Sequence, residues 1–278
     1  MSMLSYDVLV SDGVPRVTEL RMPDGSGLVS SPVSSTLIQG EHDAALADPT
    51  WTIAQTEALG DWIERSGKRL AYIYITHGHG DHWFGTAQLL QRFPGATVYA
   101  TEGTIRKMRQ QADSRADHWD HDFPGLIGDT PVLSQPIPDE GFELEGHQFR
   151  AVEVGHTDTD NTTVLHVPSI GLVVAGDVAY NGVHLMLREL GDTGLQSWLG
   201  ALDQVAALHP AVVVADHKNK HLPDDPVILD QTRQYLLDAQ RLLGQRPSPR
   251  EFFDQMVAKY PDRLNPAPVW YSALTLLN

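Results

Sequence analysis

The chain has 278 residues, of which 36 are acidic and 20 are basic, and its formal net charge is -16. This charge would repel the phosphate backbone of nucleic acids and anionic lipid headgroups, so the expected partner is a small-molecule substrate, with no nucleic acid and no membrane. The absence of cysteine excludes a disulfide framework, a thiolate metal site and a sulfur nucleophile.

The N-terminal residues and the overall patterning suggest a simple organisation. Residues 1–21 contain acidic side chains and no long apolar run, so they resemble neither a signal peptide nor a membrane anchor, and a cytoplasmic location is expected by default. No low-complexity segment or linker divides the chain. Residues 1–278 are therefore predicted to form a single domain, while the oligomeric state stays open.

Short apolar runs alternate with longer amphipathic stretches in the first half of the chain. Buried strands are predicted at 34–39 and 70–76, with a helix at 51–65 between them. A further strand is predicted at 96–100, and the polar stretch 102–119 is predicted to be a helix.

The second half begins with a β-rich region and ends with helices. The β-branched runs predict strands at 148–154, 162–167 and 171–175. A helix at 195–208, a strand at 211–215, a long helix at 226–243 and a helical stretch after Pro249 follow. Because the strands fall in two blocks that are each flanked by helices, the predicted fold is α/β, with two sheets packed face to face and helices outside, a four-layer αββα sandwich.

The strongest chemical signal comes directly after the strand predicted at 70–76. Imidazole and carboxylate groups are natural ligands of zinc and related divalent ions. Gly78 and Gly80 let the backbone fold tightly enough to turn several side chains inward. Four potential ligands fall within six residues: His77, His79, Asp81 and His82.

Three further potential ligands each follow a later apolar strand. His156 comes after the run 149–155, Asp177 after 172–176, and His217 after 212–215. If these strands lie side by side, the loops at their ends converge on the histidine cluster. The pattern therefore predicts a metal site assembled from distant parts of the chain.

The order of these motifs, HxHxDH, then Gly-His, Gly-Asp and a final His, resembles the metallo-β-lactamase fold superfamily over residues 34–217. The resemblance implies an αββα sandwich with two divalent metal ions at one edge, and zinc is the expected metal. Carried over by motif, it implies that the first metal is bound by His77, His79 and His156, the second by Asp81, His82 and His217, and that Asp177 bridges both.

One position departs from the superfamily pattern. The final histidine usually follows a glycine, whereas His217 follows Asp216. Three roles are open to this carboxylate: it could face solvent, accept a hydrogen bond from a ligand imidazole, or crowd the metal.

Two metal ions about 3.5 to 4 Å apart can share a water and lower its pKa towards neutrality. The resulting hypothesis is a metal-dependent hydrolase in which a bridging hydroxide attacks a carbonyl substrate. Asp81 is expected to orient this hydroxide and to shuttle its proton.

The substrate is inferred from a single tyrosine. Tyr180 lies three residues after Asp177, and the lactone-hydrolysing branch of the superfamily has a tyrosine at that offset. Since a phenol can donate to a developing oxyanion, a lactone or cyclic ester is the preferred substrate. β-Lactam and thioester hydrolysis remain enzymatic alternatives, and a metal-binding regulatory or binding protein of the same fold is the non-enzymatic one. The segments 102–137 and 180–195 are expected to contact the substrate.

Overall fold

The computed structural model of the chain describes residues 3–128, 130–191 and 193–277. Within these residues, the strands form two sheets, which run in the orders β1-β2-β3-β4-β5-β6 and β11-β10-β9-β8-β7. The strands of the first sheet are β1 (Ser5–Ser11), β2 (Val33–Gln39), β3 (Asp43–Ala47), β4 (Arg69–Tyr74), β5 (Thr97–Ala100) and β6 (Gln135–Pro136). Those of the second sheet are β7 (Phe142–Leu144), β8 (His147–Gly155), β9 (Thr162–Val167), β10 (Leu172–Val174) and β11 (Val212–Val214).

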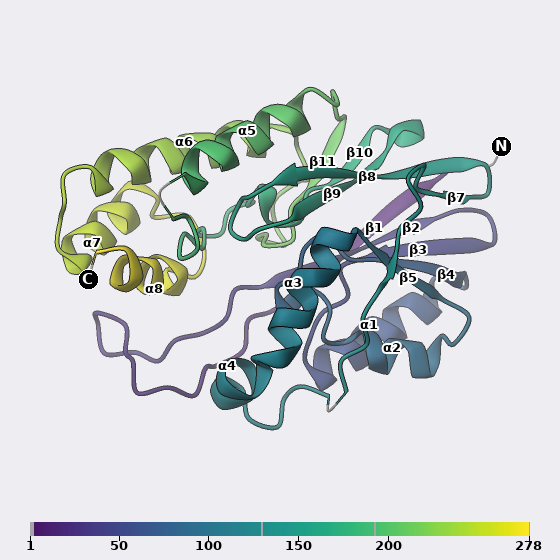
Figure 1. Ribbon diagram of the computed structural model, residues 1–278, viewed down its shortest axis with the longest axis horizontal. Helices are drawn as coiled ribbons and strands as arrows, with labels where there is room; N and C mark the ends of the chain where they lie inside the picture. Colours follow the sequence, from purple (N-terminus) through teal and green to yellow (C-terminus); the bar gives the residue numbers. More distant parts are fainter. Residues whose placement is uncertain (1–2, 129, 192, 278) are drawn as a thin grey trace.

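The helices lie in two groups, one beside each sheet (Figure 1). The group beside the first sheet consists of α1 (Ile53–Arg65), α2 (Thr86–Arg92), α3 (Glu102–Asp113) and α4 (Arg115–Asp122). The group beside the second sheet consists of α5 (Gly194–Ala206), α6 (Val227–Leu243), α7 (Pro249–Lys259) and α8 (Ala267–Leu276). None of the helices in the described ranges is both long enough and apolar enough to cross a membrane.

Separate apolar clusters fill the spaces between the layers. Leu37 and Ile38 are neighbours on β2, yet Leu37 packs with the helices of the first group and Ile38 packs towards the second sheet. On β10, Val173 likewise packs with α5 and α6, while its neighbour Val174 faces the first sheet. Successive side chains of a strand point to opposite faces, so these strands are buried on both sides. The predicted four-layer αββα sandwich is confirmed.

Hydrogen bonds between the two sheets hold the ends of their strands together beside the site. Thr163 on β9 donates its backbone N–H to the carbonyl of Thr76, just beyond β4, at 2.9 Å. The hydroxyl groups of Tyr74 and Thr163 lie 2.7 Å apart, and Ser34 N donates to Asp216 O at 2.7 Å. The loops that follow β4 and β11 are therefore fixed relative to both sheets.

Most of the predicted elements are present, with one break and several omissions, which include α2, β6 and β7. The stretch 102–119 is not one helix, because the backbone leaves the helical geometry at Ser114, whose hydroxyl donates to the carbonyl of Gln110 at 2.9 Å. The strands β1 and β3 were not predicted. Both pair with β2 in antiparallel register, a long-range contact that a local pattern does not reveal.

Candidate metal centre

The loop after β4 turns sharply so that its histidines and aspartate face inward. A Cβ on Gly80 would lie 2.1 Å from the ring of Phe84, and a Cβ on Gly78 would lie 2.6 Å from Cβ of Lys107. Neither glycine has a positive φ. The glycines of the motif are therefore required by close packing and not by a left-handed backbone, which refines the reason expected from the sequence.

The loop after β10 places Asp177 opposite this motif. It forms a short 3-10 turn, Gly176–Val178, in which Gly176 has φ +53° and a Cβ would lie 2.5 Å from Thr76 Oγ1. A side chain at position 176 would be both strained and obstructed. Gly176 thus allows the two loops to approach, and Asp177 is only 1% exposed between them.

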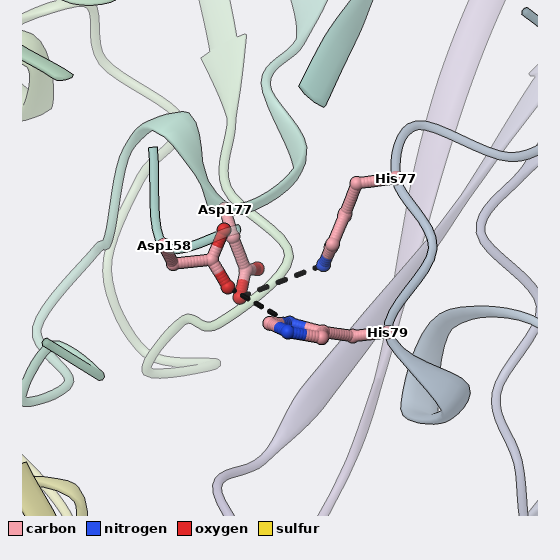
Figure 2. Close-up of side chains that lie close together, drawn as sticks. All are labelled: His77, His79, Asp158 and Asp177. Atoms are coloured by element: carbon pink, nitrogen blue, oxygen red, sulfur yellow. Dashed lines mark ion pairs between the residues drawn. The ribbon is translucent and has the colours of Figure 1, made fainter. Parts of the chain in front are cut away.

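The first group of converging ligand atoms comes from two sides of the cleft. Figure 2 shows two imidazoles from the loop after β4 facing two carboxylates from the loops after β8 and β10. His77 Nε2 lies 3.9 Å from Asp177 Oδ2, and His79 Nδ1 lies 2.9 Å from Asp158 Oδ2. One ligand atom from each member lies within 4.8 Å of those of the others: His77, His79, Asp158 and Asp177.

The second group lies beside the first and shares Asp177 with it. His82 Nε2 is 3.6 Å from Asp81 Oδ1 and 3.7 Å from Asp177 Oδ1. His217 Nε2 is 3.8 Å from Asp81 Oδ2 and 3.1 Å from Asp177 Oδ2. Asp177 therefore contacts histidines of both groups, as a bridging carboxylate would.

The chemistry of these atoms fits divalent metal ions. His77 Nε2, His82 Nε2, Asp177 Oδ1 and Asp158 Oδ2 are buried without a hydrogen-bond partner. A buried polar atom without a partner costs about 1 to 3 kcal/mol, and four such atoms around two small volumes need a common explanation. Two divalent cations would satisfy all four, since neutral imidazole and carboxylate are their preferred ligands.

Asp216 takes one of the three roles left open by the sequence. Its carboxylate is buried, and its Oδ2 lies 3.0 Å from Nδ1 of His82. With a proton on Nδ1, His82 donates to Asp216 and keeps Nε2 free for a metal. Burial raises the pKa of Asp216 to about 7. Burial and the negative charge of Asp216 raise the pKa of Asp48 well above its usual value. The two carboxyl groups are therefore disposed to share a proton.

Removing the Asp216 carboxylate should weaken the second metal site. Asp216→Gly, which restores the residue usual in this position, is expected to lower the affinity for one of two metal ions by about 10- to 100-fold, because His82 loses its orienting acceptor. Competition with a chromogenic chelator measures this affinity. Asp216→Asn keeps an acceptor oxygen for Nδ1 and serves as the matched control with a smaller loss. Unchanged affinity in Asp216→Gly would leave the carboxylate without a role at the site.

His79 is held from its far side by a charged network. Its Nε2 lies 3.3 Å from Glu189 Oε1, while Lys107 Nζ donates to Glu189 Oε2 at 2.8 Å. Although burial favours the neutral acid, the hydrogen bonds from His79 and Lys107 lower the pKa of Glu189 far below its usual value. Glu189 therefore stays ionised and fixes the ring of His79 with Nδ1 turned towards Asp158.

Tyr180 lies at the shared carboxylate. Its hydroxyl donates to Asp177 Oδ2 at 2.8 Å, and its ring is 1% exposed. Burial and the negative charge of Asp177 raise the pKa of Tyr180 well above its ordinary value. The phenol therefore stays protonated at neutral pH and can donate its O–H.

The carboxylates also set the charge of the imidazoles in the absence of a metal. Burial alone would lower the pKa of His217, but Asp177 and Asp81 outweigh it and raise this pKa to about 10. For His77, burial and the neighbouring His82 dominate and hold the pKa well below its usual value. Negative charge at Asp177 and Asp81 thus favours a positive charge at this position, which a bound cation would supply.

The structure brings six of the seven expected ligands together, and His156 is not among them. The Nδ1 atom of His156 contacts Asp160, and its Nε2 faces Gly194, where an added Cβ would lie 2.8 Å away. His156 lines a different cavity, beside Thr101 and Glu102. The residue that sequence reasoning missed is Asp158, two positions further along the same loop.

A pocket of about 260 Å³ opens beside the two groups. Both segments expected to contact the substrate contribute to its wall, through Trp119 and Phe123 from one and Met186 and Arg188 from the other. Side chains from the N-terminal segment and α8, which were not expected there, complete the wall: Arg16, Leu28, Val29, Pro268 and Tyr271. The pocket is thus partly apolar, and its floor contains Asp81, Asp177, Tyr180 and His217.

Comparison with known proteins identifies the family. The profile described as the metallo-beta-lactamase superfamily matches residues 29–217, which is more than half of the chain. The chain belongs to this superfamily. The resemblance read from the motif order is therefore confirmed, and divalent metal ions are the cofactors that this family implies.

The relatives of this chain carry different names. A type 2 metallo-beta-lactamase of Bacteroides fragilis is 25% identical over 217 residues, which cover 75% of this chain and 77% of that protein. A hydroxyacylglutathione hydrolase of Synechococcus sp. is 28% identical over 172 residues, which cover 62% of this chain and 56% of that protein. A metallo-beta-lactamase family protein of Thermus thermophilus, whose structure is solved, is similar with a TM-score of 0.64 at 20% identity, covering 97% of this chain and 91% of that one. This last similarity concerns the fold alone.

Proposed function

We propose that this protein is a dinuclear metal-dependent hydrolase that opens a lactone or a related cyclic ester. The observation that carries the proposal is the convergence of buried, unpartnered imidazole and carboxylate atoms from separate loops onto the floor of a pocket. His77 and His79 would hold one ion, His82, His217 and Asp81 the other, and Asp177 both. The superfamily resemblance also assigns His156 to the first ion, whereas the ring of His156 contacts Asp160 in this structure.

Divalent ions bound there would supply Lewis acidity to the substrate carbonyl and would lower the pKa of a water molecule. Asp81 is suited to move protons, because its side chain is 18% exposed while that of Asp177 is 1% exposed. It reaches both the pocket and the histidines of the second group. We assign Asp81 to orient the attacking water and to accept and return its proton.

Tyr180 supports the choice of a lactone. Its protonated hydroxyl stands at Asp177 and lines the pocket, where it could turn to the carbonyl oxygen as negative charge develops. The apolar wall formed by Trp119, Phe123 and Met186 suits an acyl chain.

Removing the Tyr180 hydroxyl tests this assignment. Tyr180→Phe is expected to lower kcat for a lactone by about 100-fold, the loss typical of one oxyanion donor, with little change in KM and in metal content. Steady-state kinetics and metal analysis measure these quantities. Tyr235→Phe is the matched control, since that hydroxyl is also buried but contacts His184 outside the site. Equal kcat values for both variants would contradict a catalytic role for Tyr180.

A thioester is the second candidate substrate. It is favoured by the similarity to a hydroxyacylglutathione hydrolase and by Arg16 and Arg188 in the pocket wall, since basic side chains suit an anionic thiol carrier. β-Lactams are the third candidate, favoured by the similarity to a type 2 metallo-beta-lactamase. A regulatory or binding protein of the same fold would hold metal and turn over nothing.

One panel distinguishes these substrates. The metal-loaded protein is given an acyl lactone, an aryl ester, a thioester and a chromogenic β-lactam, and kcat/KM is measured for each. The proposal predicts the highest kcat/KM for the lactone. Preference for another substrate would replace the lactone and keep the reaction class, whereas metal binding without any turnover would favour the non-enzymatic role. We also propose that residues 1–278 act as one domain, with a small molecule as partner.

A further inference from the structure

The loop between β8 and β9 presents a carboxylate to the first group of ligand atoms. Asp158 is 1% exposed, and its Oδ2 lies 2.9 Å from His79 Nδ1. Two ligand atoms of one metal ion lie at a similar separation, and the ligand atoms of His77 and Asp177 lie within 4.8 Å of both. Bond lengths of about 2.0 to 2.2 Å in a tetrahedral site place neighbouring ligand atoms roughly 3.3 Å apart.

The conformation of this loop fixes which side chain turns inward. Gly155 and Asn161 have φ values of +88° and +58° and mark the two ends of the loop. The Thr157 hydroxyl donates to Asp158 Oδ1 at 3.1 Å, so that Oδ2 is the oxygen left facing His79. Thr159 donates its hydroxyl to Glu189 at 2.8 Å and ties the loop to the same carboxylate that orients His79.

His156 points elsewhere in the same loop. Its Nδ1 contacts Asp160, and its Nε2 is buried beside Gly194 without a hydrogen-bond partner. The ring lines a cavity that contains none of the other candidate ligands of either group. In contrast, Figure 2 shows the Asp158 carboxylate beside that of Asp177, with both directed at His77 and His79. At the first group, the loop after β8 therefore presents Asp158 and not His156.

We infer that Asp158 is a ligand of the first metal ion through Oδ2, in the place of His156. This inference rests on the proposed function, because it concerns the same metal centre. Both ions would then have equivalent donors: two imidazoles, one terminal carboxylate and the shared Asp177. The added carboxylate oxygen makes the first site harder than a site with three histidines, which favours ions such as Mn²⁺ relative to zinc.

The experiment compares three variants of the full chain by Co²⁺ binding and visible absorption. Asp158→Asn is expected to weaken the binding of one of two ions by about 100-fold or more and to change the absorption spectrum. A direct ligand contributes at least as much to metal affinity as a residue that hydrogen-bonds a ligand. His156→Gln is expected to bind two ions with the wild-type spectrum. Asp160→Asn, which changes an exposed carboxylate of the same loop, is the matched control.

Thermal unfolding of the metal-free proteins separates ligand loss from misfolding. Metal-free Asp158→Asn is expected to unfold in a single cooperative transition like the metal-free wild type, because the amide keeps the shape of the side chain and an oxygen that can face His79 Nδ1. Weakened binding in His156→Gln, alone or together with Asp158→Asn, would overturn the inference. A wild type that binds no Co²⁺ would instead overturn the proposed function, so the two failures are distinguishable.

Discussion

Asp177→Ala is expected to abolish the binding of both metal ions and to reduce hydrolysis by more than about 100-fold. Substituting a residue that only hydrogen-bonds a metal ligand already costs up to about 100-fold in activity, and the loss of a ligand should cost more. Asp177 Oδ2 lies 3.9 Å from Nε2 of His77 and 3.1 Å from Nε2 of His217, so one substitution removes a ligand atom from both groups. Metal content after exhaustive dialysis and the rate on an acyl lactone give the two readouts.

The control for Asp177→Ala is the same substitution at an aspartate that lines the pocket but belongs to neither group of ligands. Asp122 lines the pocket and pairs with Arg16, and Asp122→Ala is expected to keep both ions. Retention of two ions and of full activity by Asp177→Ala would contradict the bridging role.

Asp81→Asn is expected to lower kcat by about 10²- to 10⁴-fold while the protein keeps at least one tightly bound ion. The amide preserves the shape of the side chain and one oxygen ligand, but it cannot accept a proton from the attacking water. The ratio of kcat to bound metal is the quantity to measure. Unchanged turnover with the metal retained would remove Asp81 from the proton transfer and leave it as a ligand only.

The layer order could be predicted because burial on both faces leaves a clear mark on the strands. Runs such as Leu172–Val174 are apolar at every position, since alternate side chains enter different clusters. The edge strand β1 carries no such mark, because its side chains are exposed or only half-buried. At the break between α3 and α4, the hydroxyl of Ser114 donates to the backbone carbonyl of Gln110. Such side-chain hydrogen bonds compete with the backbone hydrogen bonds of a helix, and hydrophobic periodicity does not reveal them.

The candidate site could be predicted where a ligand directly follows its strand. Asp177 and His217 come after β10 and β11, so strand pairing alone brings them together. The loop after β8 is different, because its sequence offers one histidine and two aspartates at alternate positions. Which of these turns inward depends on backbone torsions at Gly155 and Asn161, and a motif does not specify them.

The pocket wall shows a further limit of local patterns. Arg16 and Tyr271 lie near opposite ends of the chain, yet the Arg16 guanidinium lies 4.6 Å from the centre of the Tyr271 ring. Both residues line the pocket beside the two groups of candidate ligands. Neither residue belongs to a motif. Their contribution to the pocket follows only from the packing of α8 and the N-terminal segment around the sheets.

The dependence of hydrolysis on metal is tested most directly by measuring the hydrolysis rate of an acyl lactone while divalent metal is added stepwise to the metal-free protein. We expect negligible hydrolysis without metal and a rate that rises to a plateau at two ions per chain, because both groups and the shared Asp177 take part. A rate that is the same with and without metal would contradict the assignment of a metal-dependent hydrolase.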